Sequence, residues 1–359
     1  MELKIKTTDL QDMVGKSIKC VSNNKLIPIT SLINISVKDH KFQLITTDAT
    51  NYFYVSSSDK FDCDDFEVSV IADTFVKLIQ KTTSEYVILE FDGTSFKVRG
   101  NGTYNIELPL DENGDVIKFP KKLTDDFKIL VSEINLSTVK TILMYNKPSL
   151  ALSVELPALT NYYCGKSVVT SDRFKICKSD INMFDTPMLI SSQFMDLVGA
   201  TDSEVITVTR SDNAIIFECG NDTVYAPIIE GVDTFPIDPI IQLTDTPFPS
   251  ECKVSRVSVL DLLDRLSLFV TKYDKKAVRL TFTHDGIMFS SKQSSGVELI
   301  PFTESNNFSE YTCMVDIDMF KSQVASQAAD ILHLYYGSDI SLKMVTDNIT
   351  QIVALAEEE

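Results

Sequence analysis

The side chains that most often carry catalysis or bind metals are few in this sequence and form no recognisable pattern. The three histidines, His40, His284 and His333, lie far apart, and none has a second histidine or a cysteine at the spacing of a metal site. We interpret all three as structural. The seven cysteines include no Cys-x-x-Cys pair, which predicts reduced thiols in a cytoplasmic protein. We predict no metal site and no other cofactor.

Two Gly-Lys-Ser triplets, beginning at Gly15 and Gly165, look like the end of a phosphate-binding loop. Such a loop needs an earlier glycine, and Leu10 and Thr160 stand in its place. The Gly-x-Ser-x-Gly pattern of serine hydrolases does not occur either. The sequence therefore gives no positive sign of an enzyme, and we predict a protein without a catalytic site.

The elements that would position any functional residue recur three times along the chain. Phe75, Phe194 and Phe320 each open a short helical stretch that is followed by an acidic residue, a β-rich run, a turn and a further strand. Repeats of about 120 residues indicate three domains of one fold rather than a short solenoid period. We place the domains at 1–122, 123–250 and 251–359.

Each predicted domain contains two helices and several antiparallel strands, which is an α+β class. The apolar spacing predicts helices at 7–21, 73–81, 132–147, 191–199, 258–276 and 316–327. Predicted strand pairs are Ser31–Val37 with Phe42–Thr46, Leu150–Leu156 with Ser167–Thr170, and Val278–Thr283 with Ile287–Ser290. We interpret the proline-bearing stretch from Pro236 to Pro249 as a connector.

The net charge of −18 is distributed unevenly. Acidic and basic residues nearly balance within the six predicted helices, so the acidic excess lies on the predicted strands and loops. This division would suit a protein whose helices approach a polyanion, although the preference of lysine for helices explains it equally well. No apolar run is long enough to span a membrane, and we expect no membrane partner.

With the repeats aligned, the chain resembles the bacterial-type sliding clamp, the β subunit of replicative DNA polymerase III. The resemblance covers the whole length. It is carried by Leu26-Ile27-Pro28-Ile29 with Leu44-Ile45-Thr46-Thr47-Asp48-Ala49, by Val169-Thr170-Ser171-Asp172-Arg173-Phe174, and by Phe235-Pro236. We expect the source to be a bacterium or a phage.

The resemblance implies a non-catalytic, head-to-tail homodimeric ring of six domains that encircles double-stranded DNA without reading its sequence and gives the polymerase processivity. It implies that helices line the hole and that a continuous sheet forms the outside. The expected DNA-facing residues are Lys16, Lys19, Lys25, Lys77, Lys81, Lys140, Lys147, Lys272, Lys275, Lys276 and Lys321. The expected dimer interface includes Phe269 and Val270.

The resemblance also implies a pocket in which DNA polymerase and clamp-loader subunits insert short hydrophobic peptide motifs. Its expected lining is Leu152, Thr170, Arg173, Phe174, Pro236, Ile240, Ile241, Ile352, Val353 and Leu355. Two departures from the family pattern affect the rim. Ser171-Asp172 replaces a Gly-His pair, and the chain ends in Glu357-Glu358-Glu359 rather than in a methionine-rich segment.

Two other functions remain open at this point. A triplicated β-rich structural or interaction protein, such as a virion component with no DNA at its centre, is the main alternative. A hydrolase with an unrecognised carboxylate pair is the third. A clamp should be a dimer in solution that loads on nicked circular DNA only with a loader ATPase, which distinguishes it from both.

Overall fold

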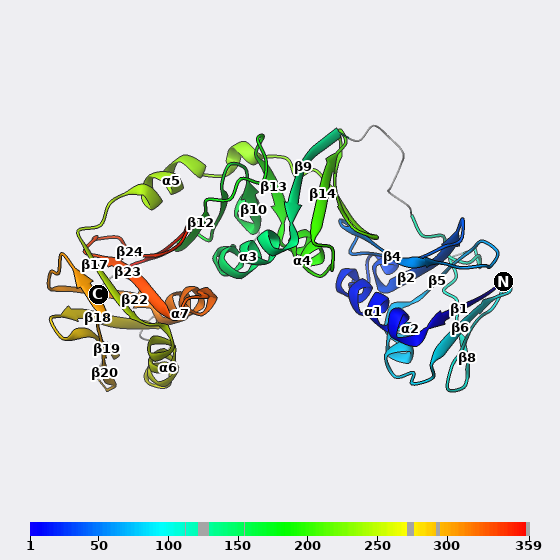
Figure 1. Ribbon diagram of the computed structural model, residues 1–359, viewed down its shortest axis with the longest axis horizontal. Helices are drawn as coiled ribbons and strands as arrows, with labels where there is room; N and C mark the ends of the chain where they lie inside the picture. Colours follow the sequence, from blue (N-terminus) through cyan, green and yellow to red (C-terminus); the bar gives the residue numbers. More distant parts are fainter. Residues whose placement is uncertain (112, 121–128, 154, 271–275, 292–294, 357–359) are drawn as a thin grey trace. The chain divides into compact units, whose positions relative to one another are not determined.

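The computed structural model describes residues 1–111, 113–120, 129–153, 155–270, 276–291 and 295–356, and these form two compact units. The first unit combines Met1–Val139 with Gln193–Ile228, and the second combines Lys140–Ser192 with Ile229–Glu359. Two of the three boundaries between the units fall inside helices, α3 (Leu136–Asn146) and α4 (Ser192–Gly199), which Figure 1 labels, and the third follows Ile228. Each unit therefore draws on two of the three predicted repeats.

The first unit contains two antiparallel sheets. The smaller has the order β1-β6-β7-β8, formed by Glu2–Lys6, Tyr86–Phe91, Phe96–Arg99 and Thr103–Ile106. The larger has the order β5-β2-β3-β4-β16-β15-β14-β9, formed by Phe66–Ile71, Leu32–Lys38, Lys41–Thr47, Tyr52–Lys60, Asp222–Pro227, Ala214–Cys219, Val205–Arg210 and Ile129–Asn135. Helices α1 (Thr7–Ser17) and α2 (Ala72–Gln80) lie side by side (Figure 1). Because β4 pairs with β16, one sheet joins the first repeat to the second.

The second unit is built in the same way. Its larger sheet has the order β13-β10-β11-β12-β25-β24-β23-β17-β21, formed by Met188–Ser191, Asn161–Cys164, Val168–Ser171, Lys175–Ser179, Ile349–Ala354, Ser341–Thr346, Ile331–Tyr336, Ser250–Ser255 and Glu304–Asn306. Its smaller sheet has the order β20-β19-β18-β22, formed by Val297–Pro301, Gly286–Ser291, Ala277–Thr283 and Tyr311–Asp316. Its remaining helices are α5 (Ile237–Asp245), α6 (Arg256–Leu266) and α7 (Ile317–Ser326). The pairing of β12 with β25 joins the second repeat to the third.

The repeat anchored on three phenylalanines is visible in the fold. Phe75, Phe194 and Phe320 lie in α2, α4 and α7, and each is at most 1% exposed. Each of these helices directly follows a strand, as do α1, α3 and α6. Local capping supports some of these junctions, since Ser255 and Asp316 accept hydrogen bonds from the backbone N–H groups of the first turns of α6 and α7. The predicted arrangement of helices and antiparallel strands is confirmed.

One predicted strand is wrong. The described residues of the run Leu150–Leu156 form no strand, and β11 pairs instead with β10 (Asn161–Cys164). The run is bounded by two short 3₁₀ helices, Lys147–Ser149 and Pro157–Thr160, and its Leu152 is completely exposed. Hydrophobic alternation alone therefore misled the prediction.

The proline-bearing connector contains a helix that the sequence did not predict. Pro236 precedes α5 and Pro239 is its third residue. The first N–H groups of a helix have no partner within the helix, so proline is tolerated there. The other boundaries differ by a few residues. The predicted 132–147 helix begins at Leu136, and the 258–276 helix ends at Leu266 before a 3₁₀ turn at Ser267–Phe269.

Buried amides tie the helices of the second unit to its large sheet. The Gln323 amide, which is fully buried, donates hydrogen bonds to the carbonyl oxygens of Ile176 (3.2 Å) and Ile352 (3.0 Å). Gln351, also fully buried, donates to the carbonyl of Tyr145 at 3.0 Å. Buried amide N–H groups that are hydrogen-bonded in this way favour one relative placement of the elements that they connect. The junction of β12 and β25 is thus held by neutral hydrogen bonds.

Within the described ranges, no helix has the length and apolar character of a membrane span.

Candidate functional site

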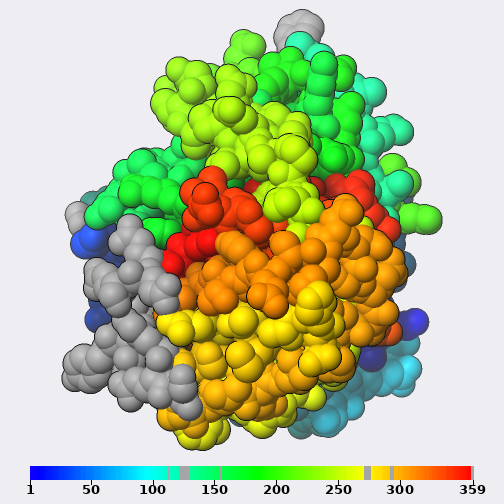
Figure 2. Space-filling view, turned by 90° about the vertical axis from the view of Figure 1, so that its left-hand side faces the viewer, coloured from blue at the N-terminus to red at the C-terminus, as the bar shows by residue number. Residues whose placement is uncertain are grey.

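The second unit has an apolar cluster where α5 packs against the large sheet, and a cavity opens beside this cluster; we call the cavity and the surface over the cluster the groove. The cluster beneath it includes Leu159, Ile240 and Ile352, all nearly buried, with Ile237 and Leu243 of α5 packed against it. Figure 2 shows the yellow-green segment that contains α5 lying against the red C-terminal segment. The structure therefore brings together two of the predicted pocket residues, Ile240 and Ile352.

The turn between β11 and β12 carries the next predicted residues. Arg173 and Phe174 are both exposed, and Arg173 has a positive φ of 80°. The Asp172 carboxylate accepts hydrogen bonds from the backbone N–H groups of Phe174 (3.0 Å) and Lys175 (2.6 Å). The departure from the family's Gly-His pair thus has a local function, because Asp172 stabilises the turn that presents Arg173 and Phe174.

Other predicted pocket residues have different environments. Thr170 is fully buried, and its hydroxyl donates to the Asn146 carbonyl at 2.8 Å. Val353 and Leu355 lie in or against the core of the third repeat, whereas Ile352 belongs to the cluster beneath the groove. Successive side chains of a strand point to opposite faces, which explains the separation. The structure does not bring Val353 or Leu355 to the groove.

A cavity of about 560 Å³ opens at the N-terminal end of α5. Its lining is mostly apolar and consists of Leu156, Pro157, Ala158, Leu159, Asn161, Leu189, Ile229, Glu230, Thr234 and Pro236. Of the predicted pocket residues, only Pro236 is among them, while Ile241 is half-buried on α5 and Leu152 is exposed nearby in the chain. A repeated sequence motif marks the Leu156 side of this cavity, and we did not use it in the prediction. Leu156-Pro157 begins a 3₁₀ turn equivalent to the one that follows Ile27 in the first repeat.

The wall formed by α5 is fixed at its C-terminal end by a buried lysine. Lys343 of β24 is 8% exposed, and its ammonium group donates to the carbonyl oxygens of Thr244 (3.2 Å) and Thr246 (2.7 Å). It also lies over the ring of Phe248, 4.7 Å from the centroid. Burial lowers the pKa of Lys343, because desolvation disfavours the charged form. Cations stabilise helix C-termini, so Lys343 holds the end of α5 to the sheet.

The lysines predicted to face DNA fall into two groups. Lys19, Lys25, Lys81, Lys140 and Lys147 are exposed. Lys77 forms an ion pair with Asp73, one helical turn away. Lys276 and Lys321 form ion pairs with Asp318 and Asp264, which lie on neighbouring elements. Lys272 and Lys275 lie outside the described residues. Lys77 and Lys276 are exposed as well, so exposure does not separate the two groups.

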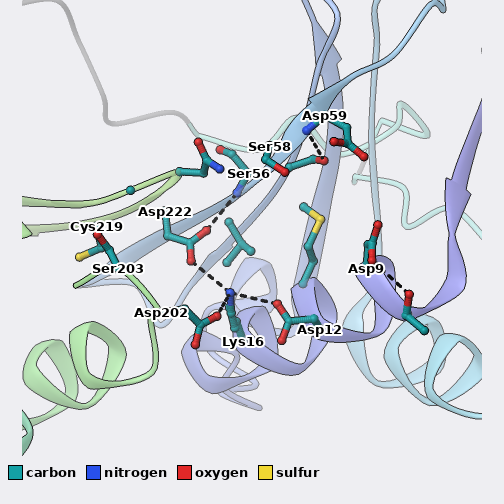
Figure 3. A pocket seen from close by; sticks show the side chains of 16 residues that line it. Asp9, Asp12, Lys16, Ser56, Ser58, Asp59, Asp202, Ser203, Cys219 and Asp222 are labelled. Atoms are coloured by element: carbon teal, nitrogen blue, oxygen red, sulfur yellow. Dashed lines mark hydrogen bonds and ion pairs between the residues drawn. The ribbon is translucent and has the colours of Figure 1, made fainter. Parts of the chain in front are cut away.

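Lys16 departs most from the prediction. Its side chain is only 16% exposed, and its ammonium group lies 3.0 Å from Asp12, 2.5 Å from Asp202 and 3.6 Å from Asp222. Figure 3 shows the three carboxylates converging on it at the edge of a cavity of about 460 Å³. Burial alone would lower the pKa of Lys16, but hydrogen bonds to Asp202 and Asp12 outweigh it and raise that pKa. Lys16 therefore connects α1 of the first repeat to the second repeat.

The comparisons with known proteins agree with this architecture. Residues 1–139 match the family model described as DNA polymerase III beta subunit, N-terminal domain. Over 100% of both chains, the structure is similar to the DNA polymerase sliding clamp of Bacillus subtilis (15% identity, TM-score 0.84), to DNA polymerase III subunit beta of Borrelia burgdorferi (15%, 0.85) and to the beta subunit of Streptococcus pyogenes DNA polymerase (14%, 0.86). A search of curated protein sequences gave no match.

The chain has the fold of a DNA polymerase III beta sliding clamp. The resemblance inferred from sequence is confirmed. The clamp fold extends over the whole chain, whereas the sequence-family match is confined to its first 139 residues.

The residues predicted to form a dimer interface adjoin an exposed edge strand. Phe269 is 50% exposed, while Val270 is partly buried against the core of the third repeat. A methyl group at Gly296 would lie 3.4 Å from the Phe269 ring, which places Phe269 beside the start of β20. Val297 and Leu299 on β20 are themselves about half exposed. Phe269 is therefore a surface residue within an apolar patch and not a core residue.

Proposed function

We propose that the protein is a DNA sliding clamp, which closes around duplex DNA as a homodimeric ring and tethers a replicative DNA polymerase in the cytoplasm. The observation that carries the proposal is the sliding-clamp fold over the full chain, together with the family match of its first domain. Clamps of this family are processivity factors and have no catalytic site. The comparisons give no support to the alternative of a virion component.

DNA binding in this proposal rests on charge and not on base recognition. The exposed lysines Lys19, Lys81 and Lys140 lie on or directly after helices, where they could reach phosphates. Contacts of this kind position a protein on DNA without specifying a sequence. A closed ring dissociates only when it opens, so a few weak contacts suffice.

Partner binding is assigned to the groove beside α5, including the cavity at Pro236. We propose that DNA polymerase and clamp-loader subunits insert a short hydrophobic motif there. The groove combines an apolar floor with walls that are already ordered, which lowers the entropic cost of binding. Leu156, Pro236 and Phe174 are exposed and available to a ligand.

The deciding experiment combines solution mass with processive synthesis. Size-exclusion chromatography with light scattering should give a dimer, and the protein should increase product length on primed circular DNA only with a loader ATPase and its polymerase. A protein that stays monomeric and leaves product length unchanged would refute the proposal. Linearising the DNA after loading is the control, because a ring should slide off free ends.

A further inference from the structure

The cavity at the N-terminal end of α5 has an acidic rim. Glu230 is one of its lining residues and is exposed. Glu155 and Asp233 are exposed and adjoin the lining residues Leu156 and Thr234 in the chain. Asp238, two residues after Pro236, lies close enough to Tyr163 to add to the effect of burial in raising the pKa of that phenol. Glu230 thus lines a mostly apolar cavity, and three further carboxylates lie within two residues of its lining in the chain.

The lysines on the strands beneath α5 do not offset these carboxylates. Lys175 donates a hydrogen bond to the Pro148 carbonyl and forms an ion pair with Asp172 at 3.4 Å. Lys178 lies 3.1 Å from Asp180 and 3.2 Å from Asp245. These cations are already neutralised by carboxylates of the same face.

Two further cations of this face are not at the cavity. Lys343 is buried, and its donors are directed at the carbonyl oxygens of Thr244 and Thr246. Arg173 is exposed on the β11–β12 turn and is not among the residues that line the cavity. Among the described residues that line the cavity, Glu230 is the one that carries a charge, so we expect its carboxylate to dominate the electrostatic potential at the mouth.

We infer that this groove selects partner peptides in which the apolar anchor is flanked by lysine or arginine. The inference rests on the proposed function and specifies the chemistry of the partner. The anchor, a leucine or phenylalanine side chain, enters the cavity between Leu156, Leu189 and Pro236. Basic flanks then lie beside Glu230 and Glu155. Complementary charge accelerates association and discriminates against peptides with acidic flanks, which the same carboxylates repel.

The test uses two labelled synthetic peptides with the same Leu-Phe centre, one flanked on each side by two lysines and the other by two glutamates. Fluorescence polarisation with the full-length protein at low salt should show that the basic peptide binds at least ~10-fold more tightly, which corresponds to about 1.4 kcal/mol. The ratio should shrink at about 0.3 M salt, where charges at the surface are screened. Equal affinities, or tighter binding of the acidic peptide, would overturn the inference.

Two variants assign the preference to this cavity. Glu230→Lys should lower the basic-to-acidic affinity ratio several-fold or invert it, whereas Glu310→Lys, at an exposed glutamate that does not line the cavity, should preserve it. Leu156→Ser removes an exposed leucine and should weaken both peptides alike, leaving the ratio intact. A ratio unaffected by Glu230→Lys, or affinities unaffected by Leu156→Ser, would contradict the assignment.

The outcome is independent of the test of ring function. If the protein supports processive synthesis but shows no preference for the basic peptide, the clamp function stands and the charge selection is refuted. If the preference is present but the protein is not retained on circular DNA, the peptide site stands and the ring function is refuted.

Discussion

Replacing Lys16 by methionine tests whether the first and second repeats are joined by an ionic lock. The substitution keeps the length of the side chain and leaves Asp222, which is 5% exposed, without its cation. Asp12 and Asp202 are mostly exposed, so losing their pairing costs little. Removing one partner of a buried ion pair costs about 3–5 kcal/mol. Because Lys16 is partly exposed, solvent screens part of this interaction. We therefore expect Lys16→Met to lower the free energy of unfolding by about 2–4 kcal/mol at pH 7.5.

The loss should depend on pH in a defined direction. Burial raises the pKa of Asp222, although Lys16 and the Ser56 N–H lower it, and without Lys16 that pKa should rise further. A carboxyl group whose pKa is higher in the folded state binds protons more readily when folded, so acid favours folding at this site. The difference in the free energy of unfolding between wild type and Lys16→Met should therefore be largest near neutral pH and should shrink as pH falls through the pKa of Asp222.

Urea unfolding followed by circular dichroism at pH 7.5 and pH 5 measures both effects. Lys16→Met combined with Asp222→Asn is the matched control, since it removes both buried charges and should recover part of the lost stability. If Lys16→Met unfolds at the wild-type urea concentration, or if its deficit is the same at both pH values, the ionic lock is not a stabilising element.

Three other predictions concern the remaining surfaces. Replacing Lys81 and Lys140 by glutamate should shorten the time that the protein is retained on circular DNA and reduce the salt dependence of that retention, without changing the thermal unfolding curve. Unaltered retention would show that these lysines do not contact DNA. Phe269→Asp should give a folded monomer by light scattering, because Phe269 is half exposed; an intact dimer would exclude it from the interface. Lys343→Met should leave the Thr244 and Thr246 carbonyls without their donor and weaken peptide binding several-fold, and Lys343→Arg should restore it. Equal peptide affinity of wild type and both variants would show that α5 does not need the Lys343 ammonium group.

The threefold organisation could be predicted from sequence because its determinants are local and repeated. Phe75, Phe194 and Phe320 open equivalent buried helices, and the turn before Gly286 joins β18 to β19 as expected. The helix α5 was missed because Pro239 suggested a break, although proline at the third position of a helix costs no hydrogen bond.

The candidate sites were less predictable because they depend on contacts between distant segments. The sequence shows Lys16 on an amphipathic helix, but its partners Asp202 and Asp222 are about two hundred residues away in the chain. Ile352 and Val353 are adjacent and equally apolar, and only the pairing of β25 with β12 decides which one lies in the cluster beneath the groove. Lys343 looks like a surface lysine until the buried carbonyls of α5 are placed beside it.

The position of β25 in the middle of the nine-stranded sheet bears on synthesis of the chain. The last strand of the first unit, β16, ends at Pro227, so that unit has all its strands while the third repeat is still being made. The second unit cannot complete its large sheet until Ile349–Ala354 has been synthesised and has paired with both β12 and β24. Until then two long strand edges remain unpaired, and open edges of this kind promote aggregation. A chain truncated before Ile349 would therefore keep a first unit that can fold and a second unit with an open sheet, a product suited to removal by proteolysis.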